Sequence, residues 1–169
     1  MIVGVDLTIT GTLGMCALPL GWDLEWRRVH VEAWTPAEPT RGLRLRQAGE
    51  RVADFARRHD ARAVYTEMIP THAFNATKLA LVAGAVFAEV SRCLGLEVVD
   101  VPISTARMLC FGAVPKGAKK GDYHAQLLRM GAPAWWGPDE RDAFVIANWG
   151  ANESGGCSIA MPPPPQGAA

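Results

Sequence analysis

The sequence predicts a mixed α/β fold, in which a five-stranded sheet is covered by helices on both faces. Three apolar segments follow one another closely at residues 2–6, 12–20 and 27–34, and such short connections are typical of antiparallel strands. Helical periodicity then alternates with two more strand-like segments, at residues 62–68 and 96–101, as parallel crossover connections require. The predicted order is therefore βββαβαβ, followed by further helices.

The helices are predicted from the spacing of apolar residues. Leu45, Ala48, Val52 and Phe55 recur at helical spacing, and charged residues fill the rest of the turn, so this helix is amphipathic. The segment 77–94 is apolar nearly all round, and we expect it to be buried either against the sheet or against a partner subunit. Three further helices are predicted at residues 104–111, 122–130 and 139–149.

Length and composition are those of one globular domain. The chain has 169 residues, of which 49% are hydrophobic and 20% are charged. We assign residues 1–150 to the folded domain and the Gly/Pro-rich residues 151–169 to a tail. No apolar segment reaches the roughly 18 residues of a membrane helix, and the N-terminus lacks a signal peptide. We therefore expect a cytoplasmic protein without a membrane partner. The four scattered cysteines predict neither a zinc site nor a disulfide framework.

The net charge is zero, but the charges are unevenly distributed. Residues 41–62 hold seven arginines and three acidic residues, whereas residues 1–40 and 131–169 each carry a net charge of −3. A basic middle between acidic ends fits a nuclease with an anionic metal site, and it also fits ordinary solvated charge.

Four acidic residues lie at positions where such sheets carry their chemistry. Asp6 ends the first strand and Glu67 ends the fourth, and functional groups collect at the carboxyl ends of parallel strands. Asp139 and Asp142 begin the last helix and share one of its faces. Each has a structural alternative: Asp6 as a turn cap, Glu67 as an exposed strand end, and Asp139 and Asp142 as acids at the helix N-cap or in its first turn.

If these carboxylates converge, they repel one another unless cations lie between them. Oxygen ligands suit Mg²⁺ or Mn²⁺. Two such ions can activate a water and stabilise the leaving oxygen when a phosphodiester is cut. The residues alone therefore favour a metal-dependent nuclease.

Three motifs in this order resemble the RuvC-type Holliday-junction resolvases of the RNase H-like superfamily. They are GVDLTITGTLG, the acid in VYTEM, and DERDAFVIANWG, in which Ala143 follows Asp142. The segment ATKLALVAGAV resembles the long central helix of that family, and KGAKKGD lies where the family carries active-site basic residues. The resemblance covers residues 1–150, and the chain length suits a compact or phage-encoded member. The first motif reads D-L-T where many members have D-P-G, and the Pro-rich tail has no counterpart.

The resemblance implies an RNase H-like sheet and a homodimer that binds branched DNA, a four-way junction, and cuts two strands symmetrically. Such a protein would act in the cytoplasm, that of the host cell if it is phage-encoded. The implied catalytic metal ligands are Asp6, Glu67, Asp139 and Asp142, which would hold two Mg²⁺ ions per active site, with Mn²⁺ able to substitute. A lysine, Lys119 or Lys120, is expected to reach this site. We also expect DNA contacts from Phe74 as an aromatic wedge and from Lys78, Lys116, Arg41, Arg44 and Arg46.

Several alternatives remain open. The same carboxylate chemistry serves a ribonuclease H that cuts RNA–DNA hybrids, and a non-catalytic junction-binding module could share the scaffold. An actin-like ATPase or sugar kinase also opens with an Asp and a Thr/Gly-rich turn, but it needs a second phosphate-binding domain for which this chain has no room. Phe74 could instead be a hydrophobic staple for the following helix, and His72 and His124 are lone histidines with no assigned role.

Overall fold

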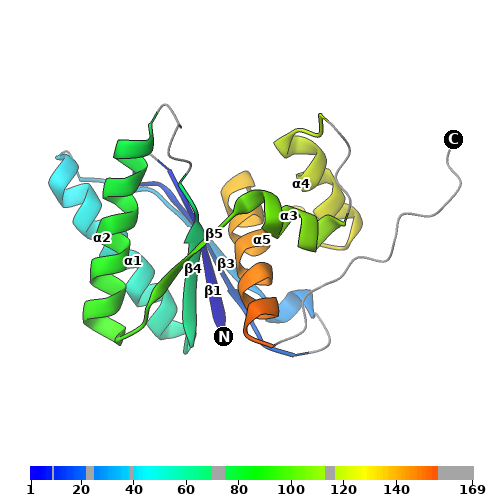
Figure 1. Ribbon diagram of the computed structural model, residues 1–169, viewed down its shortest axis with the longest axis horizontal. Helices are drawn as coiled ribbons and strands as arrows, with labels where there is room; N and C mark the ends of the chain where they lie inside the picture. The colour runs from blue at the N-terminus through cyan, green and yellow to red at the C-terminus, as the bar shows by residue number, and fades with distance from the viewer. Residues whose placement is uncertain (9, 22–24, 39, 70–74, 113–116, 156–169) are drawn as a thin grey trace, which may run out of the picture.

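The computed structural model describes residues 1–8, 10–21, 25–38, 40–69, 75–112 and 117–155 (Figure 1). The strands are β1 (Ile2–Leu7), β2 (Leu13–Leu18), β3 (His30–Trp34), β4 (Ala63–Glu67) and β5 (Val98–Val101). The helices are α1 (Arg41–Arg58), α2 (Ala76–Leu94), α3 (Ile103–Phe111), α4 (Lys120–Arg129) and α5 (Pro138–Glu153), with a short 3-10 helix, η1 (Trp26–Arg28). This order confirms the predicted succession of three strands, two crossovers and further helices.

The sheet is mixed, as predicted. Its strand order is β3-β2-β1-β4-β5. The pairs β1/β2 and β2/β3 are antiparallel, whereas β1/β4 and β4/β5 are parallel. β1 therefore lies at the centre, between the antiparallel ribbon and the crossover strands, and the two helices of the crossovers connect parallel strands in the usual way.

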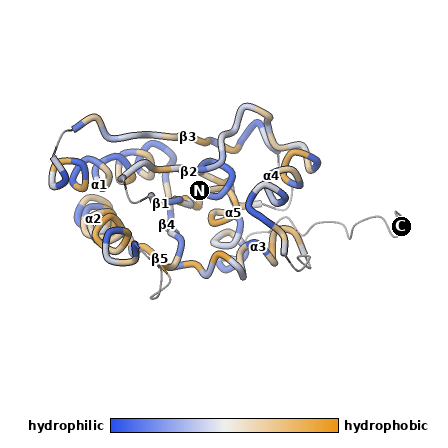
Figure 2. Tube along the Cα trace, turned by 90° about the horizontal axis from the view of Figure 1, so that it is seen from above, coloured by the Kyte–Doolittle hydropathy of each residue, from blue (hydrophilic) through white to orange (hydrophobic). Residues whose placement is uncertain are grey.

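Helices cover both faces of the sheet. In Figure 1, α1 and α2 lie on one side of the strands, and α3, α4 and α5 lie on the other; the view from above in Figure 2 shows the same separation. Alternate residues of β1 pack against the two helix layers, because successive side chains of a strand point to opposite faces of the sheet. Val3 and Val5 pack with the buried side of α1 and α2, and Ile2 packs with α5.

α5 lies unusually close to β1 because Gly4 leaves room for it. A Cβ atom at Gly4 would lie only 2.2 Å from the carbonyl oxygen of Ala143 and 2.4 Å from the backbone nitrogen of Ala147. No side chain fits in that space, so the backbone of α5 rests directly on the strand. Its inner residues are buried as a result, including Phe144 and Ile146.

Several predicted boundaries were wrong by a few residues, for local reasons. β2 ends at Leu18 rather than residue 20, because Pro19 has no N–H to continue the ladder. α4 begins at Lys120 rather than residue 122, because the Asp122 carboxylate accepts a hydrogen bond from the Lys119 backbone N–H. β5 begins at Val98 rather than residue 96.

The predicted strand 27–34 is shorter than expected because of a tertiary contact. Trp26 begins the 3-10 helix η1, and its ring packs edge-on against Trp136 at 5.6 Å between centroids. Its indole N–H also donates a hydrogen bond to the carbonyl oxygen of Met130 at 3.1 Å. These contacts with a distant segment draw the chain out of the sheet plane, so β3 starts only at His30.

The last helix continues past its predicted end at residue 149 to Glu153. Gly150 does not stop it, because its missing side chain lets the ring of Tyr65 pack against the helix; a Cβ atom there would lie 2.3 Å from that ring. The boundary that we expected at residue 150 thus falls within α5. Residues 156–169, the rest of the expected tail, lie outside the described residues.

α2 is buried on one face only. Val82, Val86 and Val90 pack into the core between α1 and the sheet, whereas Gly84 and Ala88 are exposed and Leu81 keeps 45% of its surface exposed. Within one chain, therefore, α2 buries one face against α1 and the sheet, and its opposite face stays exposed. No helix among the described residues is long and apolar enough to cross a membrane.

Candidate active site

The fold brings Asp6 and Glu67 to the same edge of the sheet. Asp6 is the next-to-last residue of β1, and Glu67 is the last residue of β4. The two strands are parallel neighbours, with Val5 paired to Thr66, so the next residue of each strand lies one step further along the same edge. Asp6 is buried, with 6% of its surface exposed, and Glu67 is half-buried.

α5 brings the other two carboxylates over this edge. Asp6 is paired across the antiparallel ladder with Gly14, and a Cβ atom at Gly14 would lie 2.2 Å from the carbonyl oxygen of Asp139. The start of α5 therefore rests on β2 beside Asp6. Asp142, one turn further along, is buried with 4% of its surface exposed.

Asp142 is surrounded by basic side chains from α3 and α4. The Lys120 ammonium lies 2.5 Å from its Oδ2. On the other oxygen, His124 Nε2 lies 3.1 Å and Arg107 Nη2 3.6 Å from Oδ1. His124 is itself buried, and the Arg107 guanidinium lies over the ring of Tyr123 at 5.0 Å from its centroid. Asp142 is thus held in place by three groups that belong to the protein.

Asp6 has no such compensation. No described residue forms a hydrogen bond or an ion pair with its carboxylate. The pKa of Asp6 is raised to about 8, chiefly by burial and next by the nearby carboxylate of Asp142. Glu67 and Asp139 contribute smaller increases to this pKa, while the Lys120 ammonium opposes them. The four carboxylates are therefore close enough to repel one another, with Asp6 at their centre.

The pKa values of two neighbours show the same balance of charges. Burial raises the pKa of Glu67, although the Arg107 guanidinium counteracts it. Burial alone would lower the pKa of Lys120, but its contact with Asp142 outweighs that effect and raises it. The cluster is a set of partly desolvated charges in which the acids outnumber the cations.

The donor set suits a hard divalent cation. Carboxylate oxygens are the ligands that Mg²⁺ and Mn²⁺ prefer, and a cation beside Asp6 would supply the positive charge that this buried acid lacks. As the side chains stand, no three His, Cys, Asp or Glu residues in the described part of the chain are close enough together to ligate an ion. The Lys120 ammonium occupies one oxygen of Asp142, so ion binding requires this lysine to move off that oxygen.

The structure distinguishes between the two candidate lysines. Lys120 lies within the carboxylate cluster. Lys119 is the N-cap residue of α4, where its backbone N–H donates a hydrogen bond to the Asp122 carboxylate at 2.8 Å, and its ammonium forms no ion pair with any described residue. Of the two lysines, therefore, Lys120 is the one that lies beside the carboxylates.

The expected DNA-contacting residues fall into three groups. Arg41, Arg44 and Lys78 line one cavity, together with the turn between β1 and β2. Arg46 points elsewhere and forms an ion pair with Glu50 at 2.7 Å. Phe74 and Lys116, the remaining two, lie outside the described residues, as does His72.

Sequence reasoning missed Arg107 and left His124 without a role. One signal for His124 was available: it follows Lys120 by four residues, so both lie on one face of α4, and the next residue of that face is the buried Leu127. Two basic residues on an otherwise buried face indicate an acidic partner. Arg107 gave no comparable signal, because its partner lies 35 positions away in the chain and only the packing of α3 on α5 brings them together.

Comparison with known proteins supports the fold. No protein-family model and no curated protein sequence matches the chain. Among solved structures, the RuvC of Thermus thermophilus superimposes with a TM-score of 0.71 at 20% sequence identity, over 93% of this chain and 98% of that one. The T. thermophilus RuvC in complex with a Holliday junction substrate gives a TM-score of 0.69 at 22% identity, over 86% and 89% of the two chains. The chain therefore has the fold of the RuvC-type Holliday-junction resolvases.

Proposed function

We propose that this protein is a metal-dependent endonuclease that resolves four-way DNA junctions by paired, symmetric cuts. The observation that carries the proposal is the environment of Asp6: a buried carboxylate, with no bonding partner among the described residues, faces three other acids at the edge of a RuvC-type sheet. A protein gains nothing in stability from such an arrangement, since uncompensated buried charge is costly. A role in binding cations accounts for it.

In this proposal Asp6, Glu67, Asp139 and Asp142 hold two Mg²⁺ ions per active site, and Mn²⁺ can substitute. Bound ions of this kind lower the pKa of a water that attacks phosphorus and stabilise the departing oxygen. The chain's own contribution is the fixed position of the four acids on β1, β4 and α5.

The basic residues around Asp142 have two separate tasks. The Lys120 ammonium lies at the carboxylate cluster. Once this ammonium moves off Asp142, it neutralises negative charge on the phosphate that is being cut. Arg107 and His124 keep the Asp142 carboxylate oriented through its other oxygen. In this proposal Lys119, one residue earlier, contacts the DNA backbone.

Paired cuts require two active sites, and we propose that the exposed face of α2 joins two copies of the chain. This face carries Leu81, Gly84 and Ala88, which recur at helical spacing and are all exposed. Small residues allow close approach of a second helix, and Leu81 supplies apolar surface to bury. Phe74 and Lys116 as DNA contacts, a tail that follows the end of α5 at Glu153, and action in the cytoplasm remain predictions.

A cleavage assay on end-labelled DNA tests the proposal. We expect paired, symmetric nicks in an immobile four-way junction in Mg²⁺ or Mn²⁺, and none in linear duplex. Asp142→Asn should abolish cutting while junction binding is kept. The matched control is Asp54→Asn, which makes the same chemical change at an exposed acid that is paired with Arg57.

The outcomes of this assay separate the alternatives. Cutting of an RNA–DNA hybrid alone would indicate a ribonuclease H, and junction binding without nicks in either metal would indicate a non-catalytic module. Normal cutting by the Asp142→Asn variant would contradict the proposed mechanism.

A further inference from the structure

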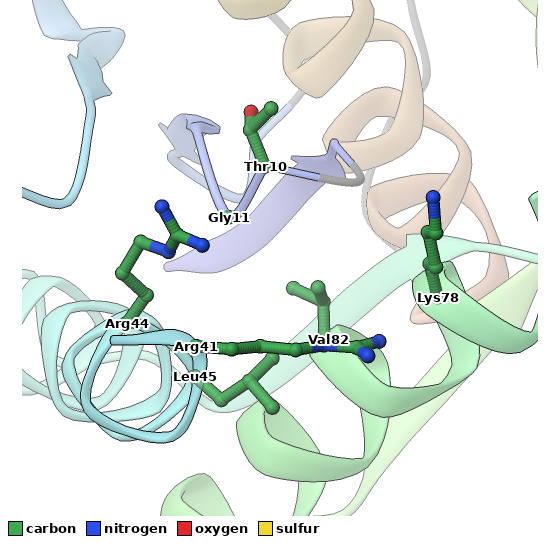
Figure 3. A pocket seen from close by; sticks show the side chains of 7 residues that line it. All are labelled: Thr10, Gly11, Arg41, Arg44, Leu45, Lys78 and Val82. Carbon is green, nitrogen blue, oxygen red and sulfur yellow. The ribbon is translucent and has the colours of Figure 1, made fainter. Parts of the chain in front are cut away.

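A cavity with a positive lining lies on the side of the β1–β2 turn opposite the carboxylates. It has a volume of about 200 Å³. Its polar lining consists of Thr10 and Gly11 from the turn, Arg41 and Arg44 from the start of α1, and Lys78 from the start of α2. In Figure 3, Arg44 and Lys78 extend toward the level of the turn, and Arg41 extends from α1 toward α2. We call this cavity the basic pocket.

The position of the basic pocket follows from the topology. β3 and β4 run parallel to β1, so α1 starts where β3 ends and α2 starts beyond the end of β4, both at the edge that carries Asp6. Leu45 and Val82 form the apolar part of the lining, which places the pocket on the α1/α2 face of the sheet. The carboxylates face α5, on the other side.

No acidic side chain in the described part of the chain neutralises the cations of the basic pocket. α1 contains six arginines, and four of them, Arg46, Arg51, Arg57 and Arg58, form ion pairs with carboxylates. The two that face the pocket, Arg41 and Arg44, form none with any described residue, and neither does Lys78. Among the residues that the structure describes, no acidic side chain lines the pocket.

The helix ends add to this positive potential. The first turns of α1 and α2 contain no acidic residue, and neither N-cap side chain bonds to the backbone N–H groups of its helix. A helix N-terminus carries partial positive charge and favours anions nearby. The positive side chains of Arg41, Arg44 and Lys78 lie at two such helix ends, so like charges repel one another in the free protein. A bound anion removes this repulsion.

We propose that the basic pocket binds a phosphate of the DNA backbone other than the one that is cut, and so holds a DNA arm against α1 and α2. This inference rests on the proposed function. The phosphate at the carboxylates and the phosphate in the basic pocket lie on opposite sides of the β1–β2 turn, so one phosphate cannot serve both sites. A DNA strand offers a regular series of phosphates and can fill the two together, which fixes its register on the protein.

Junction binding across a series of salt concentrations, in EDTA so that no DNA is cut, tests the proposal. The test variant is Arg41→Gln/Arg44→Gln. The control is Arg57→Gln/Arg92→Gln, which removes two positive charges that are paired with Asp54 and Glu89. We expect the slope of log affinity against log salt to fall by about one in the test variant, as for one lost phosphate contact. The control should keep the slope of the wild type. Equal slopes in both variants would overturn the proposal.

A second measurement removes the charge from the DNA instead of the protein. Neutral methylphosphonate groups replace single phosphates of the junction, one position at a time. We expect one position at which the substitution weakens binding of the wild-type chain but has no further effect on the Arg41→Gln/Arg44→Gln variant. If every position weakens both proteins equally, no backbone phosphate lies in the basic pocket. Should the double variant unfold at a lower temperature than the control, Lys78→Gln, on the other helix, replaces it in both measurements.

Free phosphate is the other possible source of the anion, and inorganic phosphate is its probe. If inorganic phosphate raises the unfolding temperature of the wild type but not of the test variant, while DNA binding does not depend on the pocket, the proposal fails. The result is also separable from the proposed function. If the protein cuts junctions but its salt slope does not depend on the pocket residues, only the phosphate-binding role of the basic pocket is refuted. If it binds DNA through the pocket but cuts no junction, only the proposed nuclease function is refuted.

Discussion

Glu32 and Asp6 are both carboxylates on strands of the same sheet, but their surroundings are opposite. Glu32, on the edge strand β3, accepts hydrogen bonds from Arg51 and from Arg58, the latter at 2.9 Å. Burial alone would raise the pKa of Glu32, but these two arginines outweigh it and lower the pKa below its ordinary value of 4.5. Asp6, on the central strand, has a pKa raised to about 8 by burial and by other carboxylates.

The difference separates a structural acid from the acid that we propose binds a metal ion. Glu32 is neutralised by the protein itself, and its bonds tie β3 to α1. No described residue pairs with Asp6, although three basic side chains, those of Arg107, Lys120 and His124, lie beside the neighbouring acid Asp142. This is the state expected of a group that must bind something from outside. Replacing each acid by its amide should therefore have opposite consequences.

The largest expected effect is on catalysis. Asp6→Asn should lower the rate of junction cutting by on the order of a thousandfold or more, since the charge that holds the metal ions is lost. The same variant should unfold at a temperature equal to or above that of the wild type in EDTA, because it removes a buried carboxylate from a cluster of like charges. Single-turnover cleavage and thermal unfolding check the two parts. A variant that loses stability in EDTA would show that Asp6 is a structural acid like Glu32.

Stabilisation by Mg²⁺ should depend on Asp6 and not on Glu32. Adding Mg²⁺ at about 100 times its dissociation constant should raise the free energy of unfolding by about 2.7 kcal/mol, because the ion binds only the folded chain. The gain should disappear in Asp6→Asn and persist in Glu32→Gln. Thermal unfolding with and without Mg²⁺ measures it, and an equal gain in both variants would place the ion elsewhere.

A smaller effect is expected from the lysine that contacts Asp142. Lys120→Gln should lower the cutting rate by roughly ten- to hundredfold, as is typical of residues that support a metal ligand. Lys119→Gln, one residue earlier and exposed, should lower it less. Rates under saturating DNA separate this effect from weaker binding. Equal losses in the two variants would argue against a special role for the contact between Lys120 and Asp142.

The smallest effect concerns the stability supplied by Glu32. Glu32→Gln should lower the free energy of unfolding at pH 7 by about 1 kcal/mol without changing cleavage, because it weakens two charged hydrogen bonds. Since the pKa of Glu32 is lowered on folding, this stability is present above its unfolded pKa of about 4.5 and is lost as the pH falls below that value. Unfolding curves of the two proteins at pH 7 and at decreasing pH should therefore converge in acid. A constant gap would show that the effect does not come from the charge.

Sequence reasoning predicted the fold well because its signals are local. Asp6 and Glu67 follow apolar runs at strand ends, and Asp139 and Asp142 share a face at the start of a helix, so their convergence follows from the order of the elements. The segment after Trp26 shows where this reasoning fails: residues 27–34 read as a strand, but Trp26 packs against Trp136 and the strand begins only at His30.

The site was predicted less completely, because the surroundings of a side chain depend on packing between distant segments. The contact of Arg107 with Asp142 leaves no trace in the spacing of residues. Similarly, Arg44 and Arg46 are near neighbours in sequence, but only the structure shows that one lines the basic pocket and the other is paired with Glu50.

The two glycines that admit α5 to the sheet also determine when the site can form. Gly4 and Gly14 let the backbone of this helix rest on β1 and β2, and α5 supplies half of the four carboxylates. During synthesis, a chain that has emerged only as far as β5 already carries Asp6 and Glu67 but has no complete cluster. The four carboxylates therefore come together only once the last helix has docked, and on the proposed mechanism an unfinished chain cannot cut DNA.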